Sequence, residues 1–502
     1  MLDEDICYRA LASRDRRFDG RFVVAVKTTR IYCRPGCPAP LPKRANMAFY
    51  ACAAAAEQAG FRPCRRCRPD ASPETPVWFG TAATVSRAIR LIAGGALDGK
   101  RDVAGLAARL GLGERHLRRL FAEHAGTSPA AFALTHRIHF ARRLLDETHL
   151  KVAEIAQGAG FASLRRFNDA FKKTFRATPR ELRGTPESVG SGGLALTLPY
   201  KPPFDWESLV AFLSPRAIPG VERVEHGRYR RTVDLGTGPG WIEVRPIDGK
   251  DALALEAKVR LPLDLVSLFE RTRRLFDLGA DPARIADALG DDPLLKGIVR
   301  SRLGLRVPGA WCAFEFAVRA ILGQQISVAA ATTLAGRIAD KYGTPVEAPG
   351  LSRLFPPPGR LRSADLESVG VLRSRADAIR ALAAEVVEGR LRFDELRDLD
   401  HAVARLTTLA GIGPWTAHVV AMRALGEPDA FPASDLGLKT ALQCRSVSEI
   451  EGRAQAWRPF RAYAAMALWR SLDGPGGSAF APRRSVASRW RAAERRLQEG
   501  TR

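Results

Sequence analysis

The 502-residue sequence predicts a multidomain α+β protein. At roughly 150 residues per domain, a chain of this length holds about three domains. Residues 80–184 and 306–470 place apolar side chains three and four positions apart, as helices do, whereas residues 194–305 open with the alternation of strands. Four of the eight cysteines form two close pairs near the N-terminus, which indicates a small separate unit.

The composition excludes wholesale disorder and a membrane-spanning protein. Apolar residues make up 46% and charged residues 26%, as in globular domains. No apolar run approaches the ~20 residues of a membrane span, and the acidic N-terminus is unlike a signal peptide. The net charge is +24, and the first 190 residues carry 33 basic against 18 acidic side chains. We expect a cytoplasmic, nucleoid-associated protein that binds a phosphate-rich partner and no membrane.

Composition and periodicity divide the chain into five regions. We expect a small four-cysteine zinc α/β domain over residues 1–76, an all-α domain over 80–184, a mixed α/β domain over 194–305, an all-α domain over 306–470, and a basic tail over 474–502. A Gly/Ser segment, residues 184–193, is typical of a flexible linker. Strands are expected at residues 194–198, 229–233, 241–245 and 252–259, and a loop at residues 355–359.

The two cysteine pairs predict a metal site. Cys33-Arg-Pro-Gly-Cys37 and Cys64-Arg-Arg-Cys67 can each bend two sulfurs onto one tetrahedral Zn²⁺. A purely structural zinc is the alternative interpretation. The nearby arginines, including Arg34 and Arg44, favour a thiolate that faces a phosphate backbone and acts as a nucleophile. Methylation of one sulfur would then change the formal charge of the cluster from −2 to −1 and reduce its repulsion from DNA.

Two longer motifs identify this segment more closely. Phe22-Val-Val-Ala-Val-Lys-Thr-Thr-Arg-Ile-Tyr-Cys-Arg-Pro-Gly-Cys37 and Gly60-Phe-Arg-Pro-Cys-Arg-Arg-Cys-Arg-Pro-Asp70 resemble the N-terminal domain of Ada-type methylation-response proteins. The resemblance implies that Cys33 irreversibly accepts the methyl group of a methyl phosphotriester. Cys37, Cys64 and Cys67 would complete the site of the one zinc ion.

An internal repeat lies within residues 80–184. A helix, glycine turn and helix recur at an offset of 49–50 residues, with Gly111 and Gly160 at the turns. Each second helix carries cations, and its apolar residues are expected in the core. A helical bundle with a solvated charged face is the alternative, but the repeat favours two helices that read successive major-groove faces. The candidate DNA contacts are Arg115, Arg118, Arg119, Arg165, Arg166 and Lys172.

The repeat resembles an AraC-type DNA-binding domain over its full ~100 residues. Gly160-Phe161 and Thr178-Pro179 belong to the motifs that carry this resemblance. Together with the Ada-like segment, it implies a transcription activator that methylation switches on. Promoter DNA and RNA polymerase are the partners expected for such an activator, and we expect a monomer.

A tight turn followed by an aspartate marks the last helical region. Leu406-Thr-Thr-Leu-Ala-Gly411-Ile-Gly413-Pro-Trp-Thr-Ala417 can present backbone N–H groups to a DNA phosphate. Asp435 follows about twenty residues later in Phe431-Pro-Ala-Ser-Asp435-Leu-Gly-Leu-Lys439. A helix cap is the plain alternative for this carboxylate. Together the two motifs resemble the helix-hairpin-helix DNA glycosylases, which implies that Asp435 faces a flipped nucleotide.

Three further motifs extend the resemblance to 3-methyladenine DNA glycosylase II, the AlkA type, over residues 194–470. They are Leu198-Pro-Tyr-Lys-Pro-Pro-Phe-Asp-Trp206, Ala320-Ile-Leu-Gly-Gln-Gln-Ile-Ser327 and Trp457-Arg-Pro-Phe-Arg-Ala-Tyr-Ala-Ala-Met-Ala-Leu-Trp469. The implied reaction releases alkylated bases such as 3-methyladenine and 7-methylguanine without a cofactor. Asp435 would stabilise the cationic sugar, and Trp415, Trp469 and Phe212 would wall the base pocket.

This sequence departs from the family pattern at several positions. Trp415 stands where strand-nicking relatives carry a Schiff-base lysine, so we expect base excision without strand cleavage. Val419 and Leu436 replace aromatic pocket residues, which leaves the preferred lesion open. Gln325 stands where an apolar wedge is expected, and Ile326 beside it is the other candidate for intercalation.

The regions together predict a damage sensor fused to a repair enzyme. The sequence contains no Pro-Cys-His-Arg motif, so repair of O6-methylguanine is not predicted. One alternative is a transcription regulator whose glycosylase-like region only binds DNA. Another is a repair enzyme whose front domains serve only as DNA tethers, in which case Cys33 would be a structural ligand.

Overall fold

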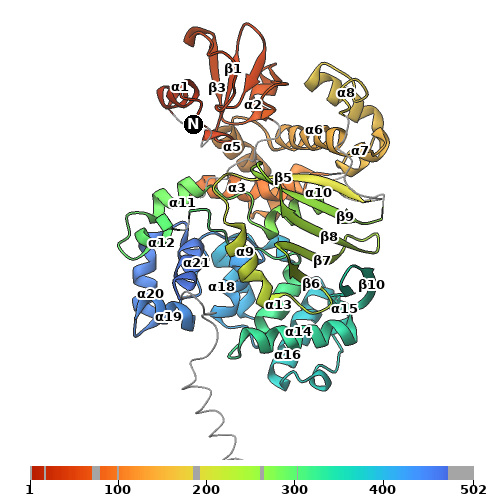
Figure 1. The fold of residues 1–502 in the computed structure, drawn as a ribbon, viewed down its shortest axis with the longest axis vertical. Coiled ribbons are helices and arrows are strands. Elements are labelled where there is room, and N and C mark those ends of the chain that lie inside the picture. Colours follow the sequence, from red (N-terminus) through yellow and green to blue (C-terminus); the bar gives the residue numbers. More distant parts are fainter. Residues whose placement is uncertain are drawn as a thin grey trace, which may run out of the picture.

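The computed structural model describes residues 3–15, 18–69, 80–98, 101–184, 193–260, 265–301 and 303–472. It confirms the multidomain α+β class. In Figure 1 the N-terminal sheet and helices α6–α8 lie at the top, a larger sheet crosses the middle, and the C-terminal helices fill the lower half. The predicted tail, residues 474–502, and most of the predicted linker, residues 184–193, lie outside the described residues.

A four-stranded sheet in the order β3-β1-β2-β4 forms the centre of the N-terminal region. Strand β2 pairs antiparallel with β1 and parallel with β4. Because parallel strands end at the same edge of a sheet, the segments that follow β2 and β4 begin side by side. The elements are α1 (Glu4–Ala12), β1 (Val23–Val26), β2 (Ile31–Cys33), η2 (Arg44–Asn46), β3 (Met47–Tyr50), α2 (Ala53–Gln58) and β4 (Arg62–Pro63).

The next region is helical, as predicted. Its two repeat units are joined by the long helix α6, which begins after the capping residue Ser128 with Pro129 in its first turn. Helices α4 and α7 are the short supporting helices, and α5 and α8 follow them after glycine turns. The elements are α3 (Gly80–Ala93), α4 (Val103–Arg109), α5 (Glu114–Ala125), α6 (Pro129–Glu147), α7 (Val152–Gly158) and α8 (Leu164–Phe175).

The middle region is built on an antiparallel sheet in the order β5-β9-β8-β7-β6. The four predicted strands correspond to β5, β7, β8 and β9, whereas β6 was not predicted. The elements are β5 (Leu194–Pro199), α9 (Trp206–Leu213), η4 (Ser214–Arg216), β6 (Glu222–Glu225), β7 (Arg228–Asp234), β8 (Pro239–Pro246), β9 (Ala252–Lys258), α10 (Leu265–Leu275), α11 (Pro282–Leu289) and α12 (Leu295–Ser301).

The last region is mainly helical, with a small hairpin, β10 and β11, that the helical periodicity did not predict. The elements are α13 (Ala313–Leu322), α14 (Val328–Tyr342), β10 (Thr344–Ala348), β11 (Leu351–Leu354), α15 (Pro358–Leu361), η5 (Glu367–Val369), α16 (Arg373–Val387), η6 (Phe393–Glu395), α17 (Leu399–Thr407), α18 (Pro414–Arg423), α19 (Leu436–Leu442), α20 (Val447–Ala454), η7 (Gln455–Trp457) and α21 (Arg461–Ser471).

One hydrophobic core joins the second repeat unit to the middle sheet and to the C-terminal helices. The ring of Phe140 on α6 lies 5.2 Å from that of Phe269 on α10. Leu265 packs so closely on Gly158 that a Cβ there would lie 2.7 Å from its Cδ1. The carboxylate of Glu147 also accepts a hydrogen bond from the Thr197 amide of β5. The activator-like and repair-like halves are therefore packed together in this structure.

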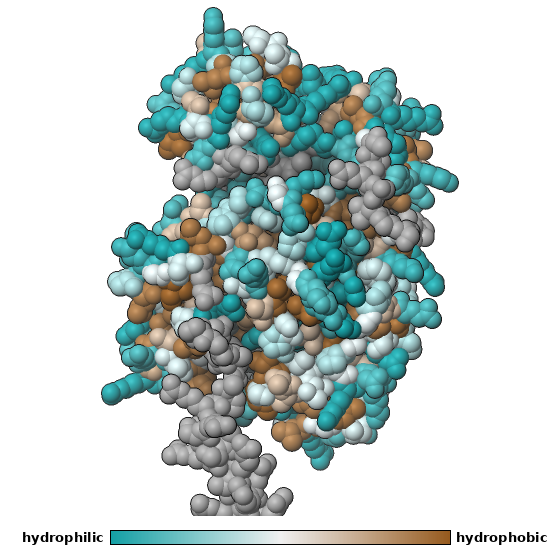
Figure 2. Space-filling view, viewed as in Figure 1, coloured by the Kyte–Doolittle hydropathy of each residue, from teal (hydrophilic) through white to brown (hydrophobic). Residues whose placement is uncertain are grey.

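The face shown in Figure 2 is largely hydrophilic, with hydrophobic residues in scattered patches. Such patches are normal for a protein surface in contact with water. Among the described residues, no helix is both long and apolar enough to span a membrane.

Candidate functional site

The four paired cysteines converge where β2 and β4 end. Tyr32 pairs with Pro63, so Cys33 and Cys64 leave the sheet next to each other. The four sulfur atoms of Cys33, Cys37, Cys64 and Cys67 all lie within 4.8 Å of one another, and all four side chains are buried. Sulfurs around one tetrahedral Zn²⁺ lie about 3.8 Å apart, given Zn–S bonds of about 2.3 Å. The predicted ligands therefore fit the ion.

The four thiols of the quartet differ in their tendency to lose a proton when no metal is bound. A hydrogen bond with Cys67 and burial raise the pKa of the Cys33 thiol well above its usual range. The same hydrogen bond lowers the pKa of Cys67 to about 6. Buried thiolates this close repel one another, and a divalent cation removes that repulsion because it binds all four in the deprotonated form.

The two arginines predicted to contact DNA beside the quartet already have carboxylate partners. Arg34 donates a hydrogen bond of 3.0 Å to Asp19, whose other oxygen accepts from the Gly36 amide at 2.8 Å. Asp19 therefore holds the loop between Cys33 and Cys37. Arg44 is exposed and pairs with Asp5. DNA contact by these two arginines stays a prediction.

A buried hydrogen-bond network joins the cysteine sheet to the helical region. Tyr32, which precedes Cys33, is fully buried and donates to Glu57 of α2 at 2.9 Å. The same carboxylate lies 2.7 Å from His139 Nε2 and accepts from the Thr135 hydroxyl at 2.7 Å. His139 and Thr135 belong to α6, so a residue next to the quartet is linked to the helix that joins the two repeat units.

The repeated units have the predicted helix-turn-helix form. Gly111 and Gly160 take left-handed φ angles of +70° and +81°, which glycine adopts without strain. Leu117 and Phe121 of α5 and Phe171 of α8 are buried, as expected. The predicted DNA contacts are all exposed on the opposite faces of α5 and α8: Arg115, Arg118, Arg119, Arg165, Arg166 and Lys172. Their contact with DNA remains a prediction.

Asp435 lies at the meeting point of three helices. Its carboxylate accepts hydrogen bonds of 2.9 Å from the indole N–H groups of Trp415 on α18 and Trp469 on α21. It also caps α19 by accepting from the Leu438 amide at 3.1 Å. Three N–H donors stabilise a negative charge, although Asp435 is only 7% exposed. The cap and the functional interpretation are therefore compatible.

The sequence motifs predicted Trp415 and Trp469 near Asp435, but only as walls of the base pocket. In the structure both also orient the carboxylate. Gly437 allows this arrangement, because a Cβ there would lie 3.0 Å from Asp435 Oδ1 and 3.0 Å from Trp469 Cδ1. The glycine two residues after the aspartate was the sequence signal for this close approach. Leu436 between them is 77% exposed.

The hairpin between α17 and α18 has two glycines with different roles. Gly411 has φ +79°, and a Cβ there would lie 2.5 Å from that of Ala378, so the fold itself requires glycine. A Cβ on Gly413 would meet nothing within 4 Å. Among the described residues, neither glycine amide has a hydrogen-bond partner. The hairpin thus offers N–H groups and an open approach to a ligand.

The predicted wedge lies in the turn between α13 and α14, attached to this hairpin. Gln324 donates to the Gly411 carbonyl at 2.8 Å and to the Thr416 hydroxyl at 2.9 Å. The next residue, Gln325, is exposed and has φ +56°, whereas Ile326 is half-buried. Gln325 is thus the more accessible of the two candidates for intercalation.

Phe212, the third predicted pocket wall, lies on α9 beside cations of the protein itself. The guanidinium carbon of Arg216 is 3.8 Å and that of Arg423 is 5.2 Å from the centre of its ring. The ring is 8% exposed. Its role as a pocket wall stays a prediction.

Comparisons with known proteins agree with these features. Four family models match the chain: the metal binding domain of Ada over residues 6–70, a helix-turn-helix domain over 106–185, the AlkA N-terminal domain over 195–312, and the HhH-GPD superfamily of base excision DNA repair proteins over 318–455. The first model covers all four clustered cysteines, and together with their geometry it makes the quartet a Zn²⁺ site.

Three curated relatives cover different parts of the chain. The chain is 34% identical over 276 residues to DNA-3-methyladenine glycosylase 2 of Escherichia coli, and the match covers 54% of this chain and 96% of that protein. It is 31% identical over 188 residues to the bifunctional transcriptional activator/DNA repair enzyme Ada of E. coli, covering 38% of this chain and 51% of the relative.

The third relative matches almost the whole chain. It is the probable bifunctional transcriptional activator/DNA repair enzyme AlkA of Mycobacterium tuberculosis, with 43% identity over 489 residues, covering 94% of this chain and 97% of the relative. The chain therefore belongs to the family of bifunctional transcriptional activator/DNA repair enzymes in which an Ada-type sensor and activator precedes an AlkA-type glycosylase.

Proposed function

We propose that this protein senses DNA alkylation, activates transcription in response, and removes alkylated bases as a monofunctional DNA glycosylase. The observation that carries the enzymatic part is Asp435, a nearly buried carboxylate held by two indoles beside an open hairpin. An aspartate that only caps a helix would not need hydrogen bonds from the two indoles. The substrates proposed are bases methylated at ring nitrogens, such as 3-methyladenine and 7-methylguanine.

The chemistry of such bases suits this site. A methylated ring nitrogen makes the base cationic, and the base leaves with the electron pair of the C1′–N bond. The sugar then carries positive charge, which the oriented Asp435 carboxylate stabilises. Water adds at C1′ and loses a proton. We propose that Asp435 is also the base that accepts this proton. Trp415, which is half-buried, is the ring proposed to stack on the extruded cationic base.

The surroundings of Asp435 provide the other parts of the proposed reaction. The amides of Gly411 and Gly413 would hold a DNA phosphate without reading sequence. Gln325 would fill the space that the flipped base leaves in the duplex. Trp415 in place of a nucleophilic lysine supports base release without strand cleavage. A covalent adduct trapped by borohydride would contradict this last point.

The sensing reaction is proposed for Cys33. Its thiolate attacks the methyl carbon of a methyl phosphotriester, an S–C bond forms, the C–O bond breaks, and the phosphodiester leaves as an anion. Bound zinc keeps the sulfurs deprotonated at neutral pH. The resulting thioether lowers the negative charge of the cluster, so the basic surface around it binds DNA more tightly. The cation-bearing helices α5 and α8 would then bind promoter DNA, and the proposed activator recruits RNA polymerase as a monomer.

The enzymatic proposal is tested by release of methylated bases from alkylated duplex DNA. Wild type should release them, and Asp435→Asn should release them about 10²–10⁴-fold more slowly. The variant keeps a capping side chain for α19, so it should remain folded and bind DNA. If folded wild-type protein binds the DNA but releases no base, residues 194–470 are only a DNA-binding module.

A further inference from the structure

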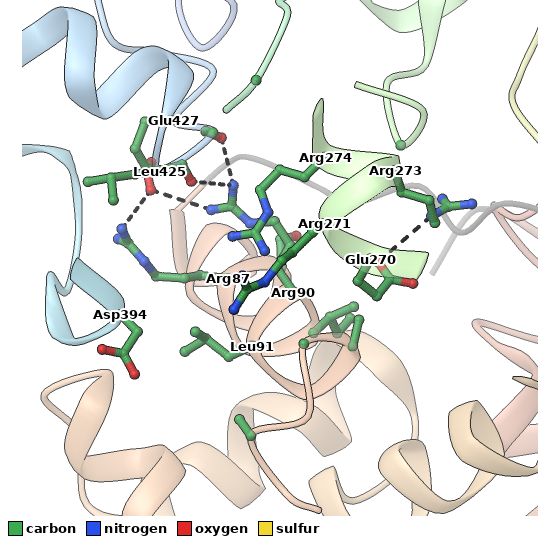
Figure 3. A pocket seen from close by; sticks show the side chains of 18 of the residues that line it. Arg87, Arg90, Leu91, Glu270, Arg271, Arg273, Arg274, Asp394, Leu425 and Glu427 are labelled. Atoms are coloured by element: carbon green, nitrogen blue, oxygen red, sulfur yellow. Dashed lines mark hydrogen bonds and ion pairs between the residues drawn. The ribbon is translucent and has the colours of Figure 1, made fainter. Parts of the chain in front are cut away.

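A large cavity lies between the helix-turn-helix region and the repair region. Its volume is about 2050 Å³, which exceeds the roughly 300–1,000 Å³ of an ordinary small-ligand pocket. Helix α3 contributes Arg87 and Arg90 to its wall, and helix α10 contributes Arg271 and Arg274 (Figure 3). None of these residues belongs to the zinc quartet, to the predicted DNA contacts, or to the Asp435 cluster.

The wall of this cavity is strongly basic. Among its described lining residues are fifteen arginines and six acidic residues. The acidic group nearest the α3 arginines is already shared: Glu427 lies 2.6 Å from Arg87 and 3.4 Å from Arg90. Arg273 is directed to the Glu270 carboxylate and the Pro199 carbonyl. Other wall arginines pair with carboxylates that do not line the cavity, as Arg34 does with Asp19 and Arg405 does with Glu385. The positive charge left without a counter-charge is therefore smaller than the number of lining arginines, and the arginines of α10 contribute to it.

Arg271 and Arg274 are two wall arginines that have no acidic partner among the described residues. Within the part of the chain that the structure describes, neither guanidinium makes a hydrogen bond or an ion pair, and Arg271 only lies over the Trp311 ring at 5.7 Å. In Figure 3 the Arg274 side chain extends from α10 toward Arg90 of α3, and it is exposed because it faces the cavity. An arginine so placed presents its five N–H donors to whatever enters.

Neighbouring positive charges make this arrangement costly. Although Arg274 is exposed to the cavity, the protein that surrounds it displaces bulk water, and this desolvation together with repulsion from Arg271 lowers the pKa of Arg274. Burial lowers the pKa of Arg90 to about 10, although Glu427 favours its charged form, and Arg87 and Arg274 add to the shift. Like charges in a partly desolvated space destabilise a fold unless a counter-charge is present. An anion bound between the helices would supply this counter-charge.

We propose that this cavity binds a phosphate-bearing ligand between α3 and α10, held by Arg90, Arg271 and Arg274. Guanidinium groups form paired hydrogen bonds to two oxygens of one phosphate, a geometry that chloride cannot match, and a phosphate can also present further oxygens to a second guanidinium. The volume admits a ligand with several phosphates, either a free polyphosphate compound or a short stretch of nucleic acid strand. Because α3 and α10 lie in different halves, bound ligand would hold the activator-like and repair-like halves together.

The test measures binding of inorganic triphosphate to the full chain by titration calorimetry at physiological salt. The test variant is Arg271→Gln/Arg274→Gln. Its matched control is Lys296→Gln/Arg300→Gln, which removes the same charge from exposed positions on α12, outside the cavity. We expect at least a tenfold weaker affinity in the test variant and an unchanged affinity in the control. Triphosphate should also raise the melting temperature of wild type and of the control, but not of the test variant.

Two results would overturn the proposal. One is that wild type does not bind triphosphate, and the other is that test variant and control bind equally well, which would place the binding on the general basic surface. Loss of these two arginines relieves repulsion, so the test variant should melt no lower than wild type. If it does melt lower, the single variant Arg274→Gln is measured instead, with the same expected direction. Arg271→Lys/Arg274→Lys keeps the charge and should restore part of the affinity.

A labelled single-stranded pentathymidylate distinguishes the two possible ligands, a nucleic acid strand and a small polyphosphate compound. If a strand is the ligand, the test variant loses affinity for this probe as well, and triphosphate displaces the probe from wild type. If the ligand is a small polyphosphate compound, the test variant loses only triphosphate binding. Both outcomes support phosphate binding in the cavity and assign its source.

Discussion

The zinc quartet and the Asp435 cluster are assembled in opposite ways. The four cysteines lie within residues 33–67, and one parallel strand pairing brings their two halves together. Asp435 instead depends on indoles twenty residues before it and thirty-four residues after it, on two other helices. The first site is a local structure that an ion completes, and the second is a product of the whole helical core. Substitutions in the zinc quartet and in the Asp435 cluster should therefore differ in their effects on zinc content, stability and base release.

The largest effect should follow loss of a zinc ligand. Cys64→Ala leaves three thiolates for the ion, and structural zinc sites contribute about 10 kcal/mol or more to folding. We expect zinc content measured by atomic absorption to fall from one ion per chain to none, with loss of structure in the N-terminal region. Base release should persist, because the Asp435 cluster lies elsewhere. Cys52→Ala, a half-buried cysteine outside the quartet, should keep its zinc.

The second prediction concerns Asp277, an aspartate that contacts the same helix as Asp435. Helix α21 supplies Trp469 to Asp435 and Tyr463 to Asp277, with the Tyr463 hydroxyl 2.8 Å from the Asp277 carboxylate. Burial raises the pKa of Asp277 to about 6. Since the unfolded chain releases this proton near pH 4, Asp277 favours folding below about pH 4, and that stabilisation is lost as the pH rises through about 6.

Asp277→Asn should therefore stabilise the protein at about pH 8 by up to about 3 kcal/mol and have little effect near pH 4. Asparagine keeps an acceptor for Tyr463 and tolerates the left-handed φ of +52° at this position. Denaturant unfolding at the two pH values checks this. A variant that is less stable than wild type at the higher pH would show that the buried charge is stabilising.

The third prediction concerns the close packing that orients Asp435. Gly437→Ala adds a methyl group against the Asp435 carboxylate and the Trp469 indole. We expect base release to slow by about 10²-fold, because a small displacement of a catalytic group has a large kinetic effect. Gly452→Ala on α20 is the control, since its added methyl meets nothing within 4 Å. Equal rates in the two variants would mean that the indole–carboxylate geometry is not needed.

The smallest effect should come from the network beside the quartet. Glu57→Gln retains the shape of the side chain but replaces one acceptor oxygen with a donor amide. Oε1 serves Tyr32 and His139 whereas Oε2 serves Thr135, so the single remaining oxygen cannot accept from both sides. We expect a loss of about 1.5 kcal/mol in stability, measured by thermal unfolding, with zinc content unchanged. If zinc is lost as well, the quartet depends on α6 and is not a local structure.

Local patterns made much of the fold predictable. The cysteine spacing, the glycine turns at Gly111 and Gly160, and four strands of the middle sheet followed from short stretches of sequence. Strand β6 was missed because Glu-Arg-Val-Glu lacks the apolar alternation of a strand, as edge strands often do. Hairpin β10–β11 was missed because a proline and charged residues interrupt its pattern.

Long-range packing was the part that the sequence did not reveal. Motifs placed Asp435, Trp415 and Trp469 in one site, but no pattern states that both indoles donate to the carboxylate. The rings of Phe140 and Phe269 are in contact, although in the sequence these residues lie on either side of the predicted flexible linker. Such contacts depend on how whole helices pack, and residues far apart in the chain carry no periodic signal of them.

The most direct test of two separate chemistries applies both assays to one alkylated duplex. Methyl transfer to protein and release of methylated bases are measured for wild type, Cys33→Ser and Asp435→Asn. Cys33→Ser should abolish methyl transfer and leave base release intact, and Asp435→Asn should do the reverse. Loss of both activities in either correctly folded variant would contradict the account, because it would make the two sites a single machine.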